Sequence, residues 1–421
     1  MSPLPTSDRV VHWETHRGRN NEFDKTEAGT AQIVLQNRDG LFDPLKADSI
    51  YTIPGNLLPM RQVTITANSP EHPTVWNPVF TGFIEGWEYT RRGPRHGQCT
   101  LSCVDGFEIL QQAQVQPVKN SAQGGHFFPV QDVKDRIRAG LQFAGWPAAR
   151  SSLFSGNVAV QKIIYPVGSS MLQVIQDAAD AEFPGVANFY MDKRGWACFR
   201  GREFRLDPFN DDWDQPSSPP AGTASRSAYL YRFGDDQAIQ ADPTLLPIAD
   251  LSWTFNQQHL YNWVTIIPAE WDERDYWKQQ VTDSVLAKKY GKRDLTISGL
   301  LTYAGTAASP VQTAGQECRR FARYYLQNYK HPKVRANVLE VHSKFEDDRI
   351  WDFLLNVELS DVVELWTVNP GGGGFAGEQF YVDGIHNVVN AEGDWPEWVS
   401  TYDLSPRGHY EYFPPPFPIG G

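Results

Sequence analysis

The two ends of this chain resemble each other. Short segments with the alternation of β-strands follow one another in the same order near both termini. The amino-terminal segments are 31–37, 61–66, 79–84 and 99–103, and the carboxyl-terminal ones are 336–342, 361–366, 380–385 and 399–404. Recurrence of strands in a fixed order indicates a duplicated unit. We therefore predict two related β-modules, and chance similarity between β-strands is the alternative.

Such a duplication favours assembly. A chain with two related β-modules presents two similar surfaces, and a ring of three such chains would present six. This geometry suits a structural role better than a catalytic one.

Length and composition narrow the classes of protein. At 421 residues, the chain should hold roughly two to four domains. Its 14 tryptophans and 13% aromatic content are typical of interfaces or of β-rich cores. The formal net charge of -12 excludes a global basic field that would attract nucleic acid or an anionic membrane. The chain has no apolar run of about 18 residues, and its start lacks the regions of a signal peptide.

The cysteines indicate a protein without disulfides. Cys99 and Cys103 lie four residues apart on a predicted strand, which separates their Cα atoms by about 13 Å. A disulfide needs less than about 7 Å. The other two, Cys198 and Cys318, form no CxxC or Cys/His ligand pattern. We expect a reduced, intracellular origin.

The predicted fold class is β-rich α+β, with two related barrel-like β-modules that flank a small α+β domain. The predicted parts are a first β-module at 1–112, the α+β domain at 113–206, a linker or long loop at 207–248, strands and a helix at 249–335, a second β-module at 336–407 and a Pro-rich tail at 408–421.

Three helices are predicted from apolar spacing and end signals. The first covers about 130–144 and stops at Gly145. The second runs over 171–182, with Ser169 or Ser170 as its cap and Pro184-Gly185 after its end. The third spans about 311–329 and cannot continue past Pro332.

A search for catalytic chemistry finds no site. Asp177, Asp180 and Glu182 crowd the second helix, and paired carboxylates serve acid–base catalysis in glycosidases. An exposed acidic helix face is the ordinary alternative, because this spacing defines no cleft. The histidines are scattered without an HExxH pattern, and no Walker loop or GxSxG elbow is present. We predict no catalytic, cofactor-binding or metal site, and hence no enzyme.

Two surface features are candidates for contact with partners. Arg91-Arg-Gly-Pro-Arg95-His is a basic hairpin tip that could touch nucleic acid or an acidic partner, and a solvated loop is the alternative. Four tryptophans near the edges of the two repeat copies are candidate interface residues, with core or ordinary surface aromatics as the alternative. They are Trp76, Trp87, Trp366 and Trp395.

An ordered set of motifs is also present along almost the whole chain. Its members are Ala31–Pro44, Val79–Glu85, Cys103–Leu110, Met171–Glu182, Met191–Arg200, Tyr261–Thr265, Tyr290–Arg293, Phe380–His386 and Ser400–Pro406. Each motif is weakly specific alone, but their order resembles that in the tail-hub proteins of tailed bacteriophages, also called baseplate hub or tail-associated minor tail proteins.

The resemblance implies a homotrimer in the virion, at the tail tip or baseplate, made in the host cytoplasm. Its pseudo-sixfold ring would meet the hexameric distal tail ring and the end of the tape-measure protein, and would adapt sixfold tail symmetry to a threefold tip. It would also enclose the channel through which DNA leaves, and an acidic lumen would not hold phosphate. We expect a non-contractile tail, although the same core serves contractile ones.

The resemblance also implies other tail-tip or receptor-binding proteins as partners. The chain stops soon after the second β-module, so we expect any receptor-binding or wall-degrading activity on another protein. Two rivals remain. A virion-associated cell-wall or glycan hydrolase would depend on Asp177 or Glu182, and a receptor- or carbohydrate-binding tail protein would use exposed tryptophans.

Overall fold

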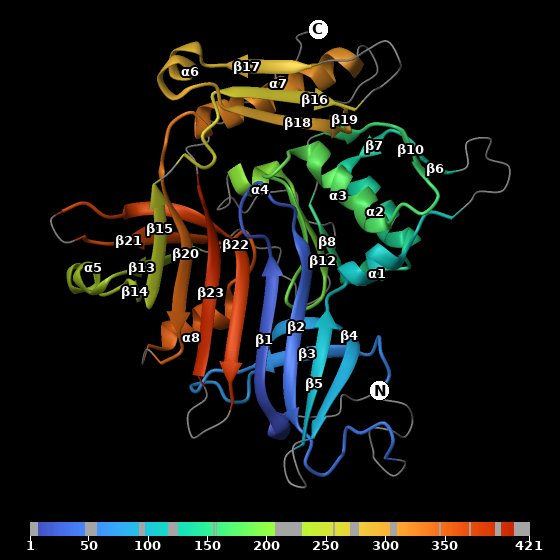
Figure 1. Ribbon diagram of the computed structural model, residues 1–421, viewed down its shortest axis with the longest axis vertical. Coiled ribbons are helices and arrows are strands. Elements are labelled where there is room, and N and C mark those ends of the chain that lie inside the picture. Colours follow the sequence, from blue (N-terminus) through green and yellow to red (C-terminus); the bar gives the residue numbers. More distant parts are fainter. Residues whose placement is uncertain are drawn as a thin grey trace.

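A single large sheet organises the structure, which is a computed structural model. It describes residues 7–46, 57–91, 97–116, 125–154, 156, 158–206, 230–255, 257–269, 278–303, 310–344, 347–369, 372–391 and 397–407. Twelve strands belong to the large sheet, which fills the lower half of Figure 1. Within the described ranges, we find no helix with the length and apolar character needed to span a membrane.

The large sheet is built from both ends of the chain. Its amino-terminal strands are β1 (Val10–Gly18), β2 (Glu27–Gln36), β3 (Gln62–Ala67), β4 (Asn77–Arg91) and β5 (Gly97–Val104). Its other strands are β13 (Leu230–Gly234), β14 (Leu246–Pro247), β15 (Asp250–Phe255), β20 (Val334–His342), β21 (Val362–Trp366), β22 (Ala376–Asn390) and β23 (Glu397–Pro406).

The strand order repeats within this sheet. Strands run β2-β5-β4-β3 in the amino-terminal part and β20-β23-β22-β21 in the carboxyl-terminal part, with each neighbouring pair antiparallel. The β-rich α+β class and the two related β-modules are therefore confirmed. We call β1–β5 the first module and β15 with β20–β23 the second module.

One apolar core lies under both modules. Alternate strand residues point inward, as the period of two along a strand requires. Leu35 and Phe80 of the first module belong to the same buried cluster as Leu339 and Tyr402 of the second. The two modules are thus packed as one body.

The small α+β part lies against the upper end of the first module. Its helices are α1 (Phe107–Gln112), α2 (Val133–Phe143), α3 (Met171–Glu182) and α4 (Arg202–Leu206), with a short helix at Ala148–Arg150. Another short helix, Ser7–Arg9, precedes β1 of the first module. Its strands are β6 (Gly125–Phe128), β7 (Gln131–Asp132), β8 (Ser151–Leu153), β9 (Ala159–Val160), β10 (Ile163–Pro166), β11 (Asn188–Met191) and β12 (Ala197–Arg200).

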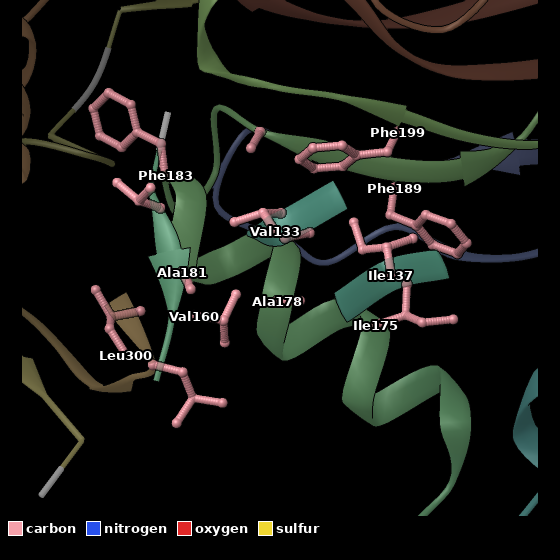
Figure 2. Packing of buried hydrophobic residues seen from close by; sticks show 14 of the residues in the cluster. Val133, Ile137, Val160, Ile175, Ala178, Ala181, Phe183, Phe189, Phe199 and Leu300 are labelled. Atoms are coloured by element: carbon pink, nitrogen blue, oxygen red, sulfur yellow. The ribbon is translucent and has the colours of Figure 1, made fainter. Parts of the chain in front are cut away.

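The two helices predicted in this part are confirmed. The Ser170 hydroxyl accepts a hydrogen bond from the Gln173 amide and caps α3. Helix α2 is followed by Gly145, which has φ +71°. Figure 2 shows how Ile137 of α2 and Ile175 of α3 meet in a second buried cluster.

A further layer lies across the top of Figure 1. It contains strands β16 (Trp263–Pro268), β17 (Gln279–Thr282), β18 (Asp294–Leu300) and β19 (Thr302–Tyr303) and helices α6 (Ser284–Tyr290) and α7 (Pro310–Tyr329). The helix predicted at about 311–329 is confirmed as α7, with Phe321 and Tyr325 buried as expected.

Sequence analysis missed several short helices. The first β-module was predicted at 1–112 without a helix, but α1 follows β5, and the Asp105 carboxylate accepts from the Phe107 amide at the start of α1. The second module contains α8 (Asp348–Asn356), and α5 (Asp236–Ala241) follows β13. These helices are too short to show a periodic apolar pattern over several turns. Most of the predicted long loop, the predicted tail and the tip at 92–96 lie outside the described residues.

Candidate assembly surface

The two modules join along β1 and β22. These strands pair antiparallel from His12–Asn390 to Gly18–Gly384. At the last pair the backbones approach closely, since a Cβ atom added to Gly18 would lie 2.2 Å from the Asp383 carbonyl oxygen. The Arg19 amide donates a hydrogen bond of 2.9 Å to that same oxygen. We call this pairing the internal joint.

Buried ion pairs reinforce the internal joint. Arg17 of β1 contacts Glu358 at 2.7 Å, and Arg19 contacts Asp383 at 3.0 Å. Arg205 reaches Asp383 from α4. Burial opposes ionisation of Glu358, but Arg17 and Lys193 outweigh it and lower the pKa of this carboxyl to about 2. Such pairs are strongly destabilising to break, because the remaining charge stays buried.

Strands β4 and β22 carry irregularities at the same places. A β-bulge separates Ile84 from Gly86 in β4, and another separates Val382 from Gly384 in β22. The register between β3 and β4 shifts after Ile65, and that between β21 and β22 shifts after Leu365. Because bulges interrupt the ladder at specific residues, they align the two modules and make Gly86 the counterpart of Gly384.

Within the described residues, each module leaves open one edge that corresponds to a side of the internal joint, and β3 also ends the strand order with a single partner. β15 pairs with β20 as β1 pairs with β2, so β15 is the counterpart of β1. β1 goes on to pair with β22, whereas the other side of β15 has no strand partner in the part of the chain that the structure describes. On β4, the edge from Gly86 to Arg91 corresponds to the edge of β22 that β1 occupies, and it too has no described strand partner.

The two open edges lie at opposite ends of the sheet. Figure 1 shows β15 at the left and β4 at the right, with β20, β23, β22, β1, β2 and β5 following one another between them. Both edges expose aromatic side chains. Trp253 and Phe255 of β15 are 47% and 67% exposed, and Tyr89 of β4 is 40% exposed. An edge strand with exposed apolar side chains is a template for pairing with another chain.

The tryptophans predicted as interface residues do not form one cluster in the described part of the structure. Trp76 precedes β4 and is 57% exposed. Trp87 lies on β4, half-buried, with its ring centroid 6.4 Å from that of Phe42. Trp366 ends β21 and donates through Nε1 to Glu364 at 2.7 Å. Trp395 lies outside the described residues.

Sequence analysis missed the aromatic residues of the open edges. It predicted strands within 249–335, but the exposure of a strand's side chains depends on which strands lie beside it, and the sequence does not show this.

The acidic residues of α3 have structural partners. Glu182 is fully buried, pairs with Arg202 at 2.8 Å and accepts from the Val158 amide. Asp180 pairs with Lys25 at 3.0 Å, and Asp177 accepts from the Tyr165 hydroxyl at 3.1 Å.

A half-open cavity of about 440 Å³ lies beside α3. Asp177, Asp180 and Lys25 line it, and burial raises the pKa of Asp177. Glu182 does not line this cavity, so the three acids do not face one common site. The described residues contain no group of three or more His, Cys, Asp or Glu side chains placed to hold a metal ion. All four cysteines are buried, and none of them is in a disulfide.

The overall architecture occurs in other proteins. A tail protein from Neisseria meningitidis MC58 superimposes with a TM-score of 0.55 at 13% sequence identity, over 94% of this chain and 92% of that chain. The 43 kDa tail protein of prophage MuSo2 from Shewanella oneidensis superimposes with a TM-score of 0.50 at 13% identity, over 94% of each chain. No protein-family model and no curated protein sequence matches the chain. The expected likeness to phage tail proteins is confirmed at the level of the fold.

Proposed function

We propose that this chain is a structural protein of a phage tail and forms the trimeric hub at the distal end of that tail. The observation that carries the proposal is the duplicated module with two open edges, in a fold shared with tail proteins over nearly the full chain. Three chains would place six similar modules around one axis.

This arrangement would adapt one symmetry to another. Six similar modules can meet a hexameric distal tail ring, while parts that occur once per chain, such as α7 and its sheet, follow threefold symmetry. The proposed partners are the distal tail ring, the end of the tape-measure protein and other proteins of the tail tip. Genomic DNA would pass through the ring, and the net charge of -12 disfavours its retention.

The proposed role is not enzymatic. The buried Glu182 carboxylate is held by Arg202 and by the Val158 amide, so changing it should affect folding rather than a reaction. A hydrolase predicts that purified chain releases sugars or peptides from cell walls. We expect no release above that by a heat-denatured sample.

Mass and symmetry test the hub proposal. Light scattering of the purified chain and negative-stain images of intact particles should give a ring of three chains with a pseudo-sixfold outline at the tail tip. A stable monomer that is absent from the tail axis would contradict the proposal and return attention to the hydrolase and the receptor-binding protein.

A further inference from the structure

We propose that β15 of one chain pairs antiparallel with the open edge of β4 in the next chain, so that each contact between chains repeats the internal joint. We call this contact the external joint. The number of chains in the ring, three, rests on the proposed hub function. The partner in the external joint is a second copy of this chain, and the geometry of the joint follows from the pairing already present within one chain.

The internal joint supplies the template. There, β1 of the first module adds to the edge of β22 in the second module. The counterparts of these strands are β15 and β4, and both have an edge without a described strand partner. A chain therefore contains both halves of a second joint, but at opposite ends of its sheet (Figure 1). Only another copy can bring these halves together.

The bulges predict the register of the external joint. In the internal joint, His16 pairs with His386 and Gly18 pairs with Gly384. The bulge alignment makes Gly86 the counterpart of Gly384, and hence Glu88 the counterpart of His386.

The position of β15 in the external joint follows from a comparison of the β15–β20 pair with the β1–β2 pair. His16 pairs with Thr30 of β2, and Trp253 pairs with Ala336 of β20 at the corresponding position. The β15–β20 pair has a register shift between Ser252 and Trp253 that the β1–β2 pair lacks there, so the alignment is taken on the Trp253 side of that shift. Trp253 should therefore lie opposite Glu88 of the next chain.

The same register places Phe255 opposite Gly86. A Cβ atom added to Gly86 would have no heavy atom within 4 Å, so open space surrounds this glycine in the single chain. Phe255 is 67% exposed and could cover it. An aromatic side chain laid over a glycine on a neighbouring strand is a known way of stabilising a sheet.

The burial of side chains differs between β1, which lies in the internal joint, and β15, which has an open edge. Alternate residues of β1 are buried, including Trp13 and Thr15, because one face of β1 packs on the core and strands flank it on both sides. On β15, no residue is buried. The open edge of β15 accounts for part of this difference, and a neighbouring strand would cover part of its exposed side chains.

Two edges that differ and complement each other make a head-to-tail contact. Contacts of this kind generate closed rings when the rotation between copies closes, and open filaments when it does not. A ring leaves no β15 or β4 edge free and so removes the aggregation hazard of exposed edges.

Cysteine cross-linking tests the pairing and its register. The variant carries Glu88→Cys and Trp253→Cys in one chain. Seven strand spacings separate these positions within a chain, roughly 34 Å, so a disulfide between them must join two chains. The native cysteines are buried, and burial raises the pKa of Cys99, Cys103 and Cys318 to about 12, which keeps these thiols unreactive.

Two matched variants calibrate the experiment. His16→Cys with His386→Cys places cysteines at the paired positions of the internal joint and should cross-link within one chain. Asp250→Cys with Glu88→Cys is displaced from the predicted register by three residues, about 10 Å, and should not cross-link.

After mild oxidation, we expect a covalent trimer on a non-reducing gel and a linked peptide that joins positions 88 and 253. An equal mixture of the two single-cysteine variants should stop at a covalent dimer. A trimer by mass that yields no such peptide, or that cross-links equally through position 250, would overturn the external joint and leave the hub proposal standing. A chain that stays monomeric alone and in tails would overturn both.

A second pair of variants guards against loss of folding. Trp253→Lys with Phe255→Lys should convert the trimer to a folded monomer, whose melting temperature falls only by the loss of the edge contact between Trp253 and Phe375, 6.3 Å between ring centroids. The matched control is Val285→Lys on α6, 73% exposed and outside both joints, which should leave the trimer intact. Persistence of the trimer in the double variant would overturn the proposal.

Discussion

Met60 and Ser360 occupy the same position in the two modules, and both have the left-handed backbone conformation that few non-glycine residues adopt. Their φ angles are 60° and 74°. The Met60 amide donates to the Ile84 carbonyl at 2.7 Å, and the Ser360 amide donates to the Val382 carbonyl at 2.8 Å. Each residue lies two positions before β3 or β21. A shared local strain at counterpart positions is strong evidence for the duplication.

Glycine at either position should stabilise the chain. The left-handed conformation costs a non-glycine residue about 1–2 kcal/mol, and glycine loses about 0.5–1 kcal/mol through greater freedom of the unfolded chain. We expect Met60→Gly and Ser360→Gly to raise the free energy of unfolding by about 0.5–1 kcal/mol. Urea unfolding followed by circular dichroism measures this difference.

The control for these glycines is Thr64→Gly. Thr64 is an exposed residue in the interior of β3, where glycine should lower the free energy of unfolding by about 0.5–1 kcal/mol. Equal effects at positions 60, 64 and 360 would contradict the strain argument.

Gly384 and Gly86 provide a matched test of the filled and open edges. A Cβ atom at Gly384 would lie 2.5 Å from Asp403 Oδ2 and 2.8 Å from the Arg19 carbonyl oxygen, whereas one at Gly86 meets nothing within 4 Å. We expect Gly384→Ala to destabilise the monomer by about 1–3 kcal/mol. Gly86→Ala should change its stability by less than about 0.5 kcal/mol.

Urea unfolding of dilute, monomeric chain is the measurement for this pair. Similar losses in both variants would show that the edge of β4 is already covered in the single chain, contrary to the structure.

Glu358 should make the chain sensitive to acid. Its folded pKa of about 2 lies below the ordinary value of 4.5, mainly because Arg17 and Lys193 outweigh the effect of burial. The ionised form therefore contributes stability above pH 4.5, and this contribution is lost as the pH falls toward 2. Glu358→Gln should cost about 3 kcal/mol at pH 7.

Urea unfolding at pH 7, 5 and 3 compares this variant with the parent chain. The gap in free energy of unfolding should narrow at pH 3. Glu85→Gln, which removes an exposed carboxylate from β4, serves as the control and should cost less than about 0.5 kcal/mol. A gap that stays constant with pH would exclude the proposed charge pairing.

Local signals allowed part of this structure to be predicted. Ser170 and Gly145 mark helix ends through their own backbone preferences, so α2 and α3 were found from sequence. Helical spacing also places Glu182 on the face of α3 that carries Ile175 and Ala178. Its partner could not be found in this way, because Arg202 comes from another element.

The candidate surface illustrates the same limit. Alternation identified β15 as a strand, but only the pairing of β1 with β22 shows that one edge of β15 is open. The bulges that align Gly86 with Gly384 are likewise set by cross-strand pairing. The order of the repeated segments could be predicted from the sequence. Which residue of one module corresponds to which residue of the other is known only from the pairing of the strands.

Asp105 should give the stability of the chain a slope near neutral pH. It is 3% exposed and accepts hydrogen bonds from the Gly29 amide at 2.8 Å and the Phe107 amide at 2.9 Å. Burial outweighs these bonds and raises the pKa of the carboxyl from 3.8 to about 7. Between these values the folded chain binds more protons than the unfolded chain, so the contribution of Asp105 to stability falls as the pH rises toward 7.

The test compares the parent chain with Asp105→Asn at pH 5, 6, 7 and 8. Asparagine keeps one acceptor oxygen, so one of the two amides loses its bond and the variant should be less stable by about 1–3 kcal/mol at pH 5. This difference should shrink toward pH 8, where the parent carboxyl is ionised in its buried site. Burial also raises the pKa of Asp403, to about 6, but that residue is common to both chains and cancels in the comparison. A difference that is the same at all four pH values would show that Asp105 is already ionised in the folded chain at pH 5.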